Sequence, residues 1–167
     1  GPVENYWDRN SGTFRSIWQS TASAEYYPYV RPQETGHHTD AAWLQLNGFT
    51  VVQTDGPFEF SVLRQRVEGL DGEDAVGRPY QWPNYSPDDP KDEDAARNVL
   101  RRQTHLNDVP VQPFTEVCLD YHMTSVGGYD SWGARPEKER TLWSDRSYTY
   151  GFALVPGKAK KAYKYAY

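Results

Sequence analysis

The sequence predicts an all-β, antiparallel fold with one short surface helix. Aromatic residues make up 15% of the 167 residues, and the 13 Tyr and 6 Trp belong to residue types that favour strands. In residues 147–155, large side chains alternate with smaller ones at the two-residue period of a strand. A single stretch of the chain carries clear helix signals, so strands are expected to supply most of the regular structure.

Strand candidates follow one another along the chain, separated by long connections. Residues 41–52 hold strand-type residues around Asn47-Gly48, a dipeptide that favours the tight turn of a hairpin. Residues 26–32 are expected to be extended, but their two prolines restrict them to a sheet edge or a loop. The other strand candidates are 14–21, 58–63, 115–124 and 147–155.

The helix signals lie in the middle of the chain. Residues 70–89 are rich in Gly, Pro and Asp and are expected to form a loop. Asp89 then offers an N-cap, and Pro90 suits the first helical position. Acidic residues follow directly and arginines come later, an order that matches the helix dipole. We therefore expect the one short surface helix between Asp89 and Arg102.

Composition argues against several classes of partner. The net charge is -5, with 18 basic and 23 acidic residues, whereas a phosphate-backbone partner needs concentrated Lys and Arg. No apolar run approaches the ~20 residues of a membrane-spanning helix. Cys118 is the single cysteine and can form neither an internal disulfide nor a multi-thiolate metal site. We therefore expect no nucleic-acid partner and no membrane partner.

A glycine-rich segment near the C-terminal end is the most informative feature of the chain. The paired Gly127 and Gly128 permit a turn through positive φ, and Asp130 and Ser131 can hydrogen-bond their own backbone to hold it. Such a loop can present the indole of Trp132 as a flat apolar face for a sugar ring. The alternative is that Trp132 fills the end of its own core, since aromatic side chains dominate protein interiors.

Three collinear segments of the chain form a recognisable set. They read Gly-Pro-Val-Glu-Asn-Tyr-Trp-Asp-Arg at 1–9, Tyr-Val-Arg-Pro-Gln-Glu-Thr-Gly at 29–36 and Gly-Gly-Tyr-Asp-Ser-Trp at 127–132. Together they resemble the C-terminal domain of family-2 glycoside hydrolases of the β-galactosidase type. The sequence departs from the family pattern at Thr35, where Asn is common, and at Tyr129, where Asp is common. The middle of the chain, about residues 64–113, is also enlarged.

The resemblance implies an antiparallel β-supersandwich of the galactose mutarotase type, incomplete at its N-terminal side. Residues 1–156 would form this C-terminal sandwich domain of a larger enzyme, with a loop-rich insertion at about 64–113, and residues 157–167 a frayed basic tail. In the family, both catalytic glutamates lie in a barrel domain that this chain lacks. The implied function is therefore part of an enzyme acting on terminal β-galactosides, with no catalytic residue in this chain and no activity of the chain alone.

The resemblance also implies a substrate-binding role for Trp132, which matches the family's tryptophan in the wall of the sugar site, with Asp130 and Tyr129 beside it. It implies no cofactor or metal in this chain, because any Mg²⁺ or Na⁺ is held by other domains. The expected partners are the β-galactoside and the barrel and other domains of the parent chain, and a homo-oligomeric parent fits as well. The bacterial cytoplasm and the periplasm both suit such a parent.

The remaining polar residues invite catalytic and metal-binding interpretations that the sequence does not support. A retaining glycosidase needs two carboxyl groups about 5–5.5 Å apart, and nothing in the sequence pairs any of the candidate carboxylates. His37 and His38 are adjacent, and on an extended segment they point to opposite faces, so we expect a solvated loop there. The acidic candidates are Asp55, Glu59, Asp120 and Asp130.

The opening motif is expected to have a structural role. Asn5, Asp8 and Arg9 lie close together in a loop, where the arginine can bind a carboxylate and lock the backbone.

Two other functions compete with the enzyme-domain hypothesis. An autonomous carbohydrate-binding module would use Trp132 together with Tyr129 or Trp143 as an aromatic platform. A purely structural or oligomerisation domain would instead bury Trp132.

Overall fold

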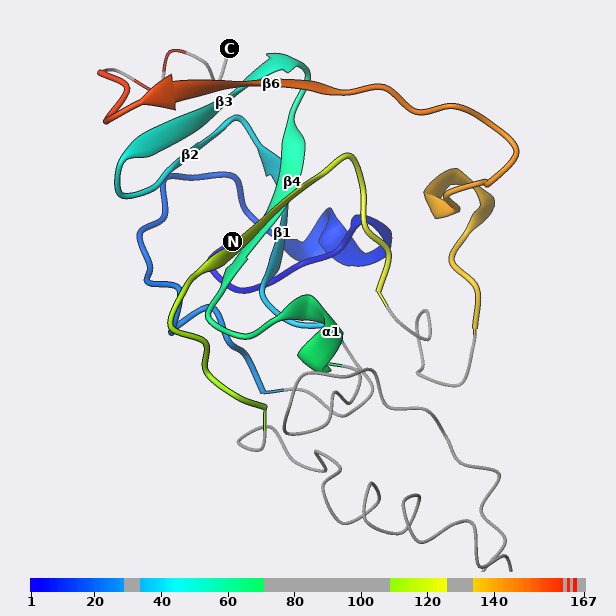
Figure 1. The fold of residues 1–167 in the computed structure, drawn as a ribbon. Coiled ribbons are helices and arrows are strands. Elements are labelled where there is room, and N and C mark those ends of the chain that lie inside the picture. The colour runs from blue at the N-terminus through cyan, green and yellow to red at the C-terminus, as the bar shows by residue number, and fades with distance from the viewer. Residues whose placement is uncertain (29–33, 71–108, 126–133, 161, 163, 165–167) are drawn as a thin grey trace, which may run out of the picture. The chain divides into compact units, whose positions relative to one another are not determined.

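The computed structural model describes residues 1–28, 34–70, 109–125, 134–160, 162 and 164 (Figure 1). The chain divides into two compact units. The sheet unit comprises residues 1–20, 36–62 and 117–167, and the small unit comprises residues 21–35 and 63–116. The sheet unit supplies the candidate site.

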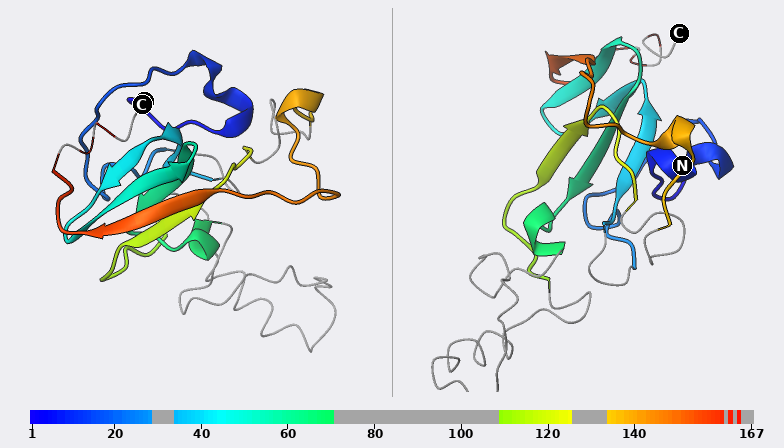
Figure 2. Two further views of the ribbon diagram at one scale, coloured as in Figure 1. Left: turned by 90° about the horizontal axis from the view of Figure 1, so that it is seen from above. Right: turned by 90° about the vertical axis from the view of Figure 1, so that its right-hand side faces the viewer.

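The regular structure of the described residues is mainly strand, in two three-stranded sheets (Figures 1 and 2). One sheet has the order β1-β4-β5 and the other β2-β3-β6. The pairings β1–β4, β2–β3 and β3–β6 are antiparallel, so the predicted all-β, antiparallel class is confirmed. The strands are β1 (His37–Ala41), β2 (Trp43–Gln45), β3 (Phe49–Asp55), β4 (Phe58–Leu63), β5 (Glu116–Asp120) and β6 (Gly151–Pro156).

The hairpin predicted at Asn47-Gly48 is present between β2 and β3. Gly48 has φ +99°, a left-handed value that a side chain would strain. Gln45 pairs with Thr50 across the turn, and the Leu46 amide donates to the Phe49 carbonyl at 2.9 Å. The turn chemistry of the sequence therefore sets the register of the β2–β3 pair.

The two sheets are continuous through this hairpin, because β1 runs directly into β2 and β3 into β4. Near its junction with β2, strand β1 is irregular at Asp40, which has φ +58°. The β1–β4 register shifts there, between His38 and Ala41. The connection from β3 to β4 turns at Gly56, which has φ +77°. The irregularities mark where the chain leaves one sheet and enters the other.

The interior of the sheet unit combines apolar and polar residues. Val51 and Phe58 are fully buried, as the strand pattern predicts. His37, Thr50 and Glu59 are equally inaccessible, although such residues are seldom buried without partners. The buried pair of His37 and Glu59 is the basis of the candidate site.

The small unit has its own apolar cluster, formed by Leu63, Leu70 and Val109 with Tyr26 packed against it. A short helix, α1 (Val67–Leu70), contributes to it, and the sequence did not indicate this helix. The Val67 amide donates to the Glu116 carboxylate at 3.0 Å and so ties the start of the helix to another part of the small unit.

Several expected elements are shorter than predicted or wrong. Residues 14–20 form no strand, and the large apolar side chains in that stretch are exposed, because they have no neighbouring strand within the described residues. Residues 26–28 are not strand, and 29–32 lie outside the described residues. The strands predicted at 115–124 and 147–155 are observed as the shorter strands β5 and β6. The helix predicted between Asp89 and Arg102 falls outside the described residues.

The expectation of a solvated loop at His37-His38 is wrong, because both residues belong to β1 and His37 is buried. The expectation of a frayed tail is wrong for its first residues. The Gly157 amide donates to the Gly48 carbonyl at 2.7 Å, and the Ala159 amide donates to the Thr50 hydroxyl at 3.0 Å. The folded β2–β3 hairpin supplies these acceptors, and the sequence of the tail does not indicate that they are present.

The described helices are a four-residue α-helix and the short 3₁₀ helices η1 (Trp7–Gly12) and η4 (Lys138–Arg140). None of them has the length and apolar character that crossing a membrane requires.

Candidate functional site

The predicted sugar-binding residues Tyr129, Asp130 and Trp132 lie outside the described residues. The described chain stops at Ser125 and resumes at Ala134. Within the sheet unit, the residues that precede this segment join a buried polar and aromatic cluster. We call it the Glu59 cluster, and its members are Tyr6, Trp7, His37, Glu59 and His122.

Glu59 stands on β4, and its side chain is only 2% exposed. Its carboxylate accepts three hydrogen bonds. The Oε2 atom takes one from His37 Nε2 at 2.8 Å and one from the Met123 amide at 2.7 Å. The Oε1 atom takes one from His122 Nδ1 at 2.8 Å. One buried carboxylate thus joins β4, β1 and the residues that follow β5.

Burial is the main influence on the electrostatics of Glu59. It raises the pKa of the Glu59 carboxyl to about 7, because the charged form loses its hydration. The hydrogen bonds from His122 and Met123 and the charge of His122 oppose this shift, whereas Asp40 adds to it. Burial likewise raises the pKa of Asp120, and the charge of His37 counteracts that rise.

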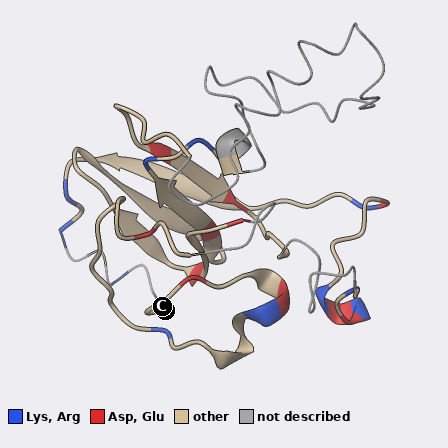
Figure 3. Cartoon of the chain, turned by 90° about the horizontal axis from the view of Figure 1, so that it is seen from below, with Lys and Arg blue, Asp and Glu red and all other residues tan. Residues whose placement is uncertain are grey.

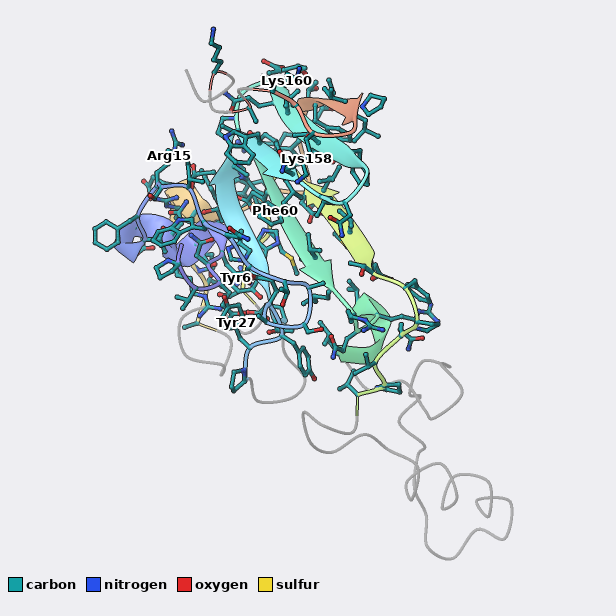
Figure 4. All side chains as sticks on the ribbon, turned by 90° about the vertical axis from the view of Figure 1, so that its left-hand side faces the viewer. Tyr6, Arg15, Tyr27, Phe60, Lys158 and Lys160 are labelled. Atoms are coloured by element: carbon teal, nitrogen blue, oxygen red, sulfur yellow. The ribbon has the colours of Figure 1, made fainter. Side chains whose placement is uncertain are left out.

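Aromatic rings of the opening motif cover both histidines. The Trp7 ring stacks on His122 with centroids 3.7 Å apart and an angle of 17°. The Tyr6 ring stacks on His37 at 5.2 Å and 19°, and Figure 4 shows Tyr6 beside β1. The Arg140 guanidinium lies 4.7 Å from the centre of the Trp7 ring and donates to the Trp7 carbonyl at 3.1 Å. The rings therefore restrict the orientation of each imidazole.

The opening motif also binds the chain just before the undescribed segment. Asp8 is buried and accepts from the Ser125 amide at 2.9 Å and from the Ser125 hydroxyl at 2.6 Å. The Trp7 amide donates to the Met123 carbonyl at 2.9 Å. Figure 3 shows that η1, which carries Asp8, and η4, which carries Arg140, both hold charges of both signs. The structural role expected for Asp8 is confirmed.

The same motif is tied to the start of β1. Asn5 is buried. Its backbone amide donates to the His37 carbonyl at 2.8 Å, and its side-chain oxygen accepts from the Thr39 backbone amide at 2.7 Å. Arg9 Nη2 lies 3.6 Å from Glu4 Oε1, and its guanidinium lies 4.5 Å from the centre of the Tyr6 ring. The structural roles expected for Asn5 and Arg9 are therefore also confirmed.

An aromatic row lies elsewhere in the sheet unit. Tyr121 packs against Tyr148 and Tyr150, with ring centroids 5.4 Å and 6.0 Å away. Phe152 extends the row at 6.0 Å from Tyr150, and the Tyr148 hydroxyl donates to the Trp143 carbonyl. Tyr148, Phe152 and Trp143 are all partly exposed, so this row could present aromatic surface to a ligand.

The geometry makes Glu59 a structural carboxylate. An acid or base that acts on a substrate must reach it, whereas Glu59 is buried and already accepts three hydrogen bonds. In the part of the chain that the structure describes, no three His, Cys, Asp or Glu residues are placed to hold a metal ion. The arrangement is suited to holding residues 121–125 in place.

Sequence reasoning missed this cluster, although two signals were present. Glu59 is a lone carboxylate inside the apolar run Phe58–Leu63, a position that demands buried partners. The adjacent His37 and His38 also carried a signal, since a strand directs one of two neighbours inward. The partner His122 could not be found, because it lies 63 residues away.

Comparison with known proteins places the chain in a family. The family described as "Beta galactosidase small chain" matches residues 1–154. The chain belongs to this β-galactosidase small-chain family. Curated relatives include the β-galactosidase of Priestia megaterium, 31% identical over 93% of this chain and 13% of that protein. The β-galactosidase of Pseudoalteromonas haloplanktis is 26% identical over 94% of this chain and 12% of its own length.

A shorter and closer similarity occurs with the β-galactosidase of Lactobacillus delbrueckii subsp. bulgaricus, 44% identical over 46 residues, which are 28% of this chain and 4% of that protein. The chain thus spans only about an eighth of the first two relatives (13% and 12%). The matched residues 1–154 include both the opening motif and the Gly-Gly-Tyr-Asp-Ser-Trp segment.

Proposed function

We propose that this chain is the C-terminal sandwich region of a family-2 β-galactosidase and contributes to an enzyme that hydrolyses terminal β-galactosides. The match to the small-chain family over residues 1–154 is the observation that carries this proposal. The β-galactosidase names of the relatives support the same reaction for the parent protein.

In this proposal the chemistry belongs to the rest of the enzyme. Both catalytic glutamates lie in the barrel domain, and any Mg²⁺ or Na⁺ is bound by other domains. The buried, fully bonded state of Glu59 supports this division, because a carboxyl group that is already engaged by three partners is not free to act on a substrate. The partners of the chain are the β-galactoside and the other domains, in an enzyme that can be homo-oligomeric.

The contribution of this chain is a sugar-contacting wall. Trp132 provides the flat apolar face, with Asp130 and Tyr129 holding the loop and meeting the sugar. The bonds of Asp8 and Trp7 to Ser125 and Met123 support this role, because a recognition loop needs an ordered base.

The test uses the full-length protein that contains this region and the 167-residue chain alone. The full-length protein should release a chromogenic aglycone from an aryl β-galactoside, and the chain alone should release none. Enzyme-proportional release by the chain alone, lost on changing one of its own carboxylates, would overturn the division of roles. A full-length protein without β-galactosidase activity would overturn the proposed reaction.

The exposed aromatic row favours one second candidate, an autonomous carbohydrate-binding module. Titration of the chain alone with galactose and lactose distinguishes the two. Saturable binding that Tyr148→Ala and Trp143→Ala abolish would support the module, and no binding would support the enzyme wall.

A further inference from the structure

The last described residues before segment 126–133 are held by two carboxylates from different parts of the sheet unit. Glu59 on β4 accepts the Met123 amide at 2.7 Å, and Asp8 in η1 accepts the Ser125 amide at 2.9 Å. Glu59 also binds the His122 ring at 2.8 Å. Three of the four consecutive residues 122–125 are thus held by buried carboxyl groups.

A buried carboxylate at position 59 is not a requirement of a stable strand. Its side chain is 2% exposed, and Leu63, which lies on the same face of β4, is a buried apolar residue. An apolar side chain in such a place often stabilises a fold as well as a buried ionic group does. An apolar residue at position 59 could not orient His122 or the Met123 amide. Glu59 orients both through its hydrogen bonds.

We propose that Glu59 is a positioning residue for sugar binding, because it fixes residues 122 and 123 and hence the place where the chain enters the segment that carries Trp132. This inference rests on the proposed function, since the placement matters only if Trp132 meets the sugar. Glu59 itself touches neither substrate nor reacting atoms.

The hydrogen-bond pattern predicts which substitutions preserve the geometry. In Glu59→Gln, the amide oxygen can accept from Met123 and His37, and the NH₂ group can donate to His122 Nδ1 once that ring takes its other tautomer. Glu59→Gln should therefore keep the arrangement without the charge. Glu59→Ala leaves three donors without their acceptor.

The first experiment measures the kinetics of the full-length enzyme with an aryl β-galactoside. Glu59→Ala should raise KM about tenfold with kcat within about twofold, because lost placement weakens binding in the ground and transition states alike. Glu59→Gln should stay within about threefold of the wild-type KM. The matched control is Glu116→Ala, which removes a carboxylate that also accepts a backbone amide, but in the small unit.

The second experiment is a double-mutant cycle with Trp132→Ala. If Glu59 acts through Trp132, Glu59→Ala should change KM less than about twofold once the indole is gone. Persistence of the full tenfold effect in the Trp132→Ala background would overturn the proposal, because it would show a general disturbance of the fold.

A second pair of variants covers the case in which Glu59→Ala fails to fold. His122→Ala removes the ring that Glu59 holds, whereas the side-chain amide of His122→Asn can replace the Nδ1 donor. His122→Ala should raise KM about five- to tenfold, and His122→Asn should recover much of the loss. An unchanged KM in the soluble variants of Glu59 and His122, in an enzyme where Trp132→Ala raises KM, would reject this inference alone. A wild-type protein inactive on β-galactosides would reject the proposed function instead.

Discussion

The two sheets of the sheet unit are built on different principles. In β2-β3-β6 the register follows from a hairpin turn, and Val51 is fully buried opposite Leu154 of the edge strand. In β1-β4-β5 the interior contains His37 and Glu59, whose partners come from the opening motif and from residues after β5. In the first sheet the β2–β3 pair is specified by local sequence, whereas β6 joins it from a distant part of the chain. In the second sheet the buried polar residues depend on contacts with distant segments.

We expect β2-β3-β6, called here the apolar sheet, to serve mainly the stability of the fold. We expect β1-β4-β5, called here the polar sheet, to serve the proposed placement of the segment that carries Trp132. Substitutions in the apolar sheet should therefore change the free energy of unfolding and leave KM alone. Substitutions that act through the Glu59 cluster should change KM or the pH dependence of stability.

The largest effect is expected at Trp132, the residue that the polar sheet is proposed to serve. Trp132→Ala in the full-length enzyme should raise KM by about ten- to a hundredfold with little change in kcat, because burying one aromatic face against a sugar contributes about 1–3 kcal/mol. Trp132→Phe should recover part of the loss. The control is Trp18→Ala, which removes a half-exposed indole elsewhere and should leave KM unchanged. An unchanged KM with a lowered Tm in Trp132→Ala would instead place Trp132 in the core.

The next effect concerns the pH dependence of stability. Burial raises the pKa of Glu59 from its ordinary value of 4.5 to about 7, so between these values the folded chain binds a proton that the unfolded chain has lost. The stabilising contribution of this group is complete below pH 4.5 and disappears as the pH rises through about 7. The free energy of unfolding should fall by up to about 1.4 kcal/mol per pH unit across this window.

Glu59→Gln should remove this component, since an amide does not titrate. Denaturant titrations of the wild type and Glu59→Gln from pH 5 to 8 provide the measurement. Parallel stability curves for the two proteins would contradict the assignment to Glu59. Glu116→Gln is the matched control, because it makes the same carboxyl-to-amide change at a residue of the small unit.

A smaller effect is expected in the apolar sheet. Val51→Ala deletes two buried methyl groups and should cost about 2 kcal/mol of unfolding free energy. Its cross-strand partner Leu154 is 59% exposed, so Leu154→Ala should cost less than about 1 kcal/mol. Both should leave KM within error of the wild type. A raised KM in Val51→Ala would contradict the expectation that substitutions in this sheet change only stability.

The smallest expected effect tests the local origin of the hairpin. Gly48→Ala introduces a side chain at φ +99°, where space is open but the backbone is strained, and should cost about 1 kcal/mol. Gly12→Ala also adds a methyl group to open space, but without a left-handed φ, and should be close to neutral. Equal melting temperatures for the two variants would show that the turn does not depend on glycine.

The family motifs and the local elements were predictable from sequence. The hairpin followed from Asn47-Gly48 and β4 from its apolar run, because turn chemistry and side-chain alternation act over a few residues. The structural role of Asn5 and Asp8 was also predictable, since clustered polar side chains in a loop tend to bind backbone groups. Residues 14–20 were misassigned because strand-type composition cannot supply a neighbouring strand.

The sequence by itself determined the all-β class, the hairpin register and the resemblance that relates Trp132 to a sugar site. Only the tertiary structure decided that Glu59 is a shared acceptor for His37 and His122, which stand 22 and 63 residues away. The physical reason is the environment of the carboxyl group. Its pKa and its partners depend on burial and on donors from distant segments, and these exist only after the strands and the opening motif have packed together.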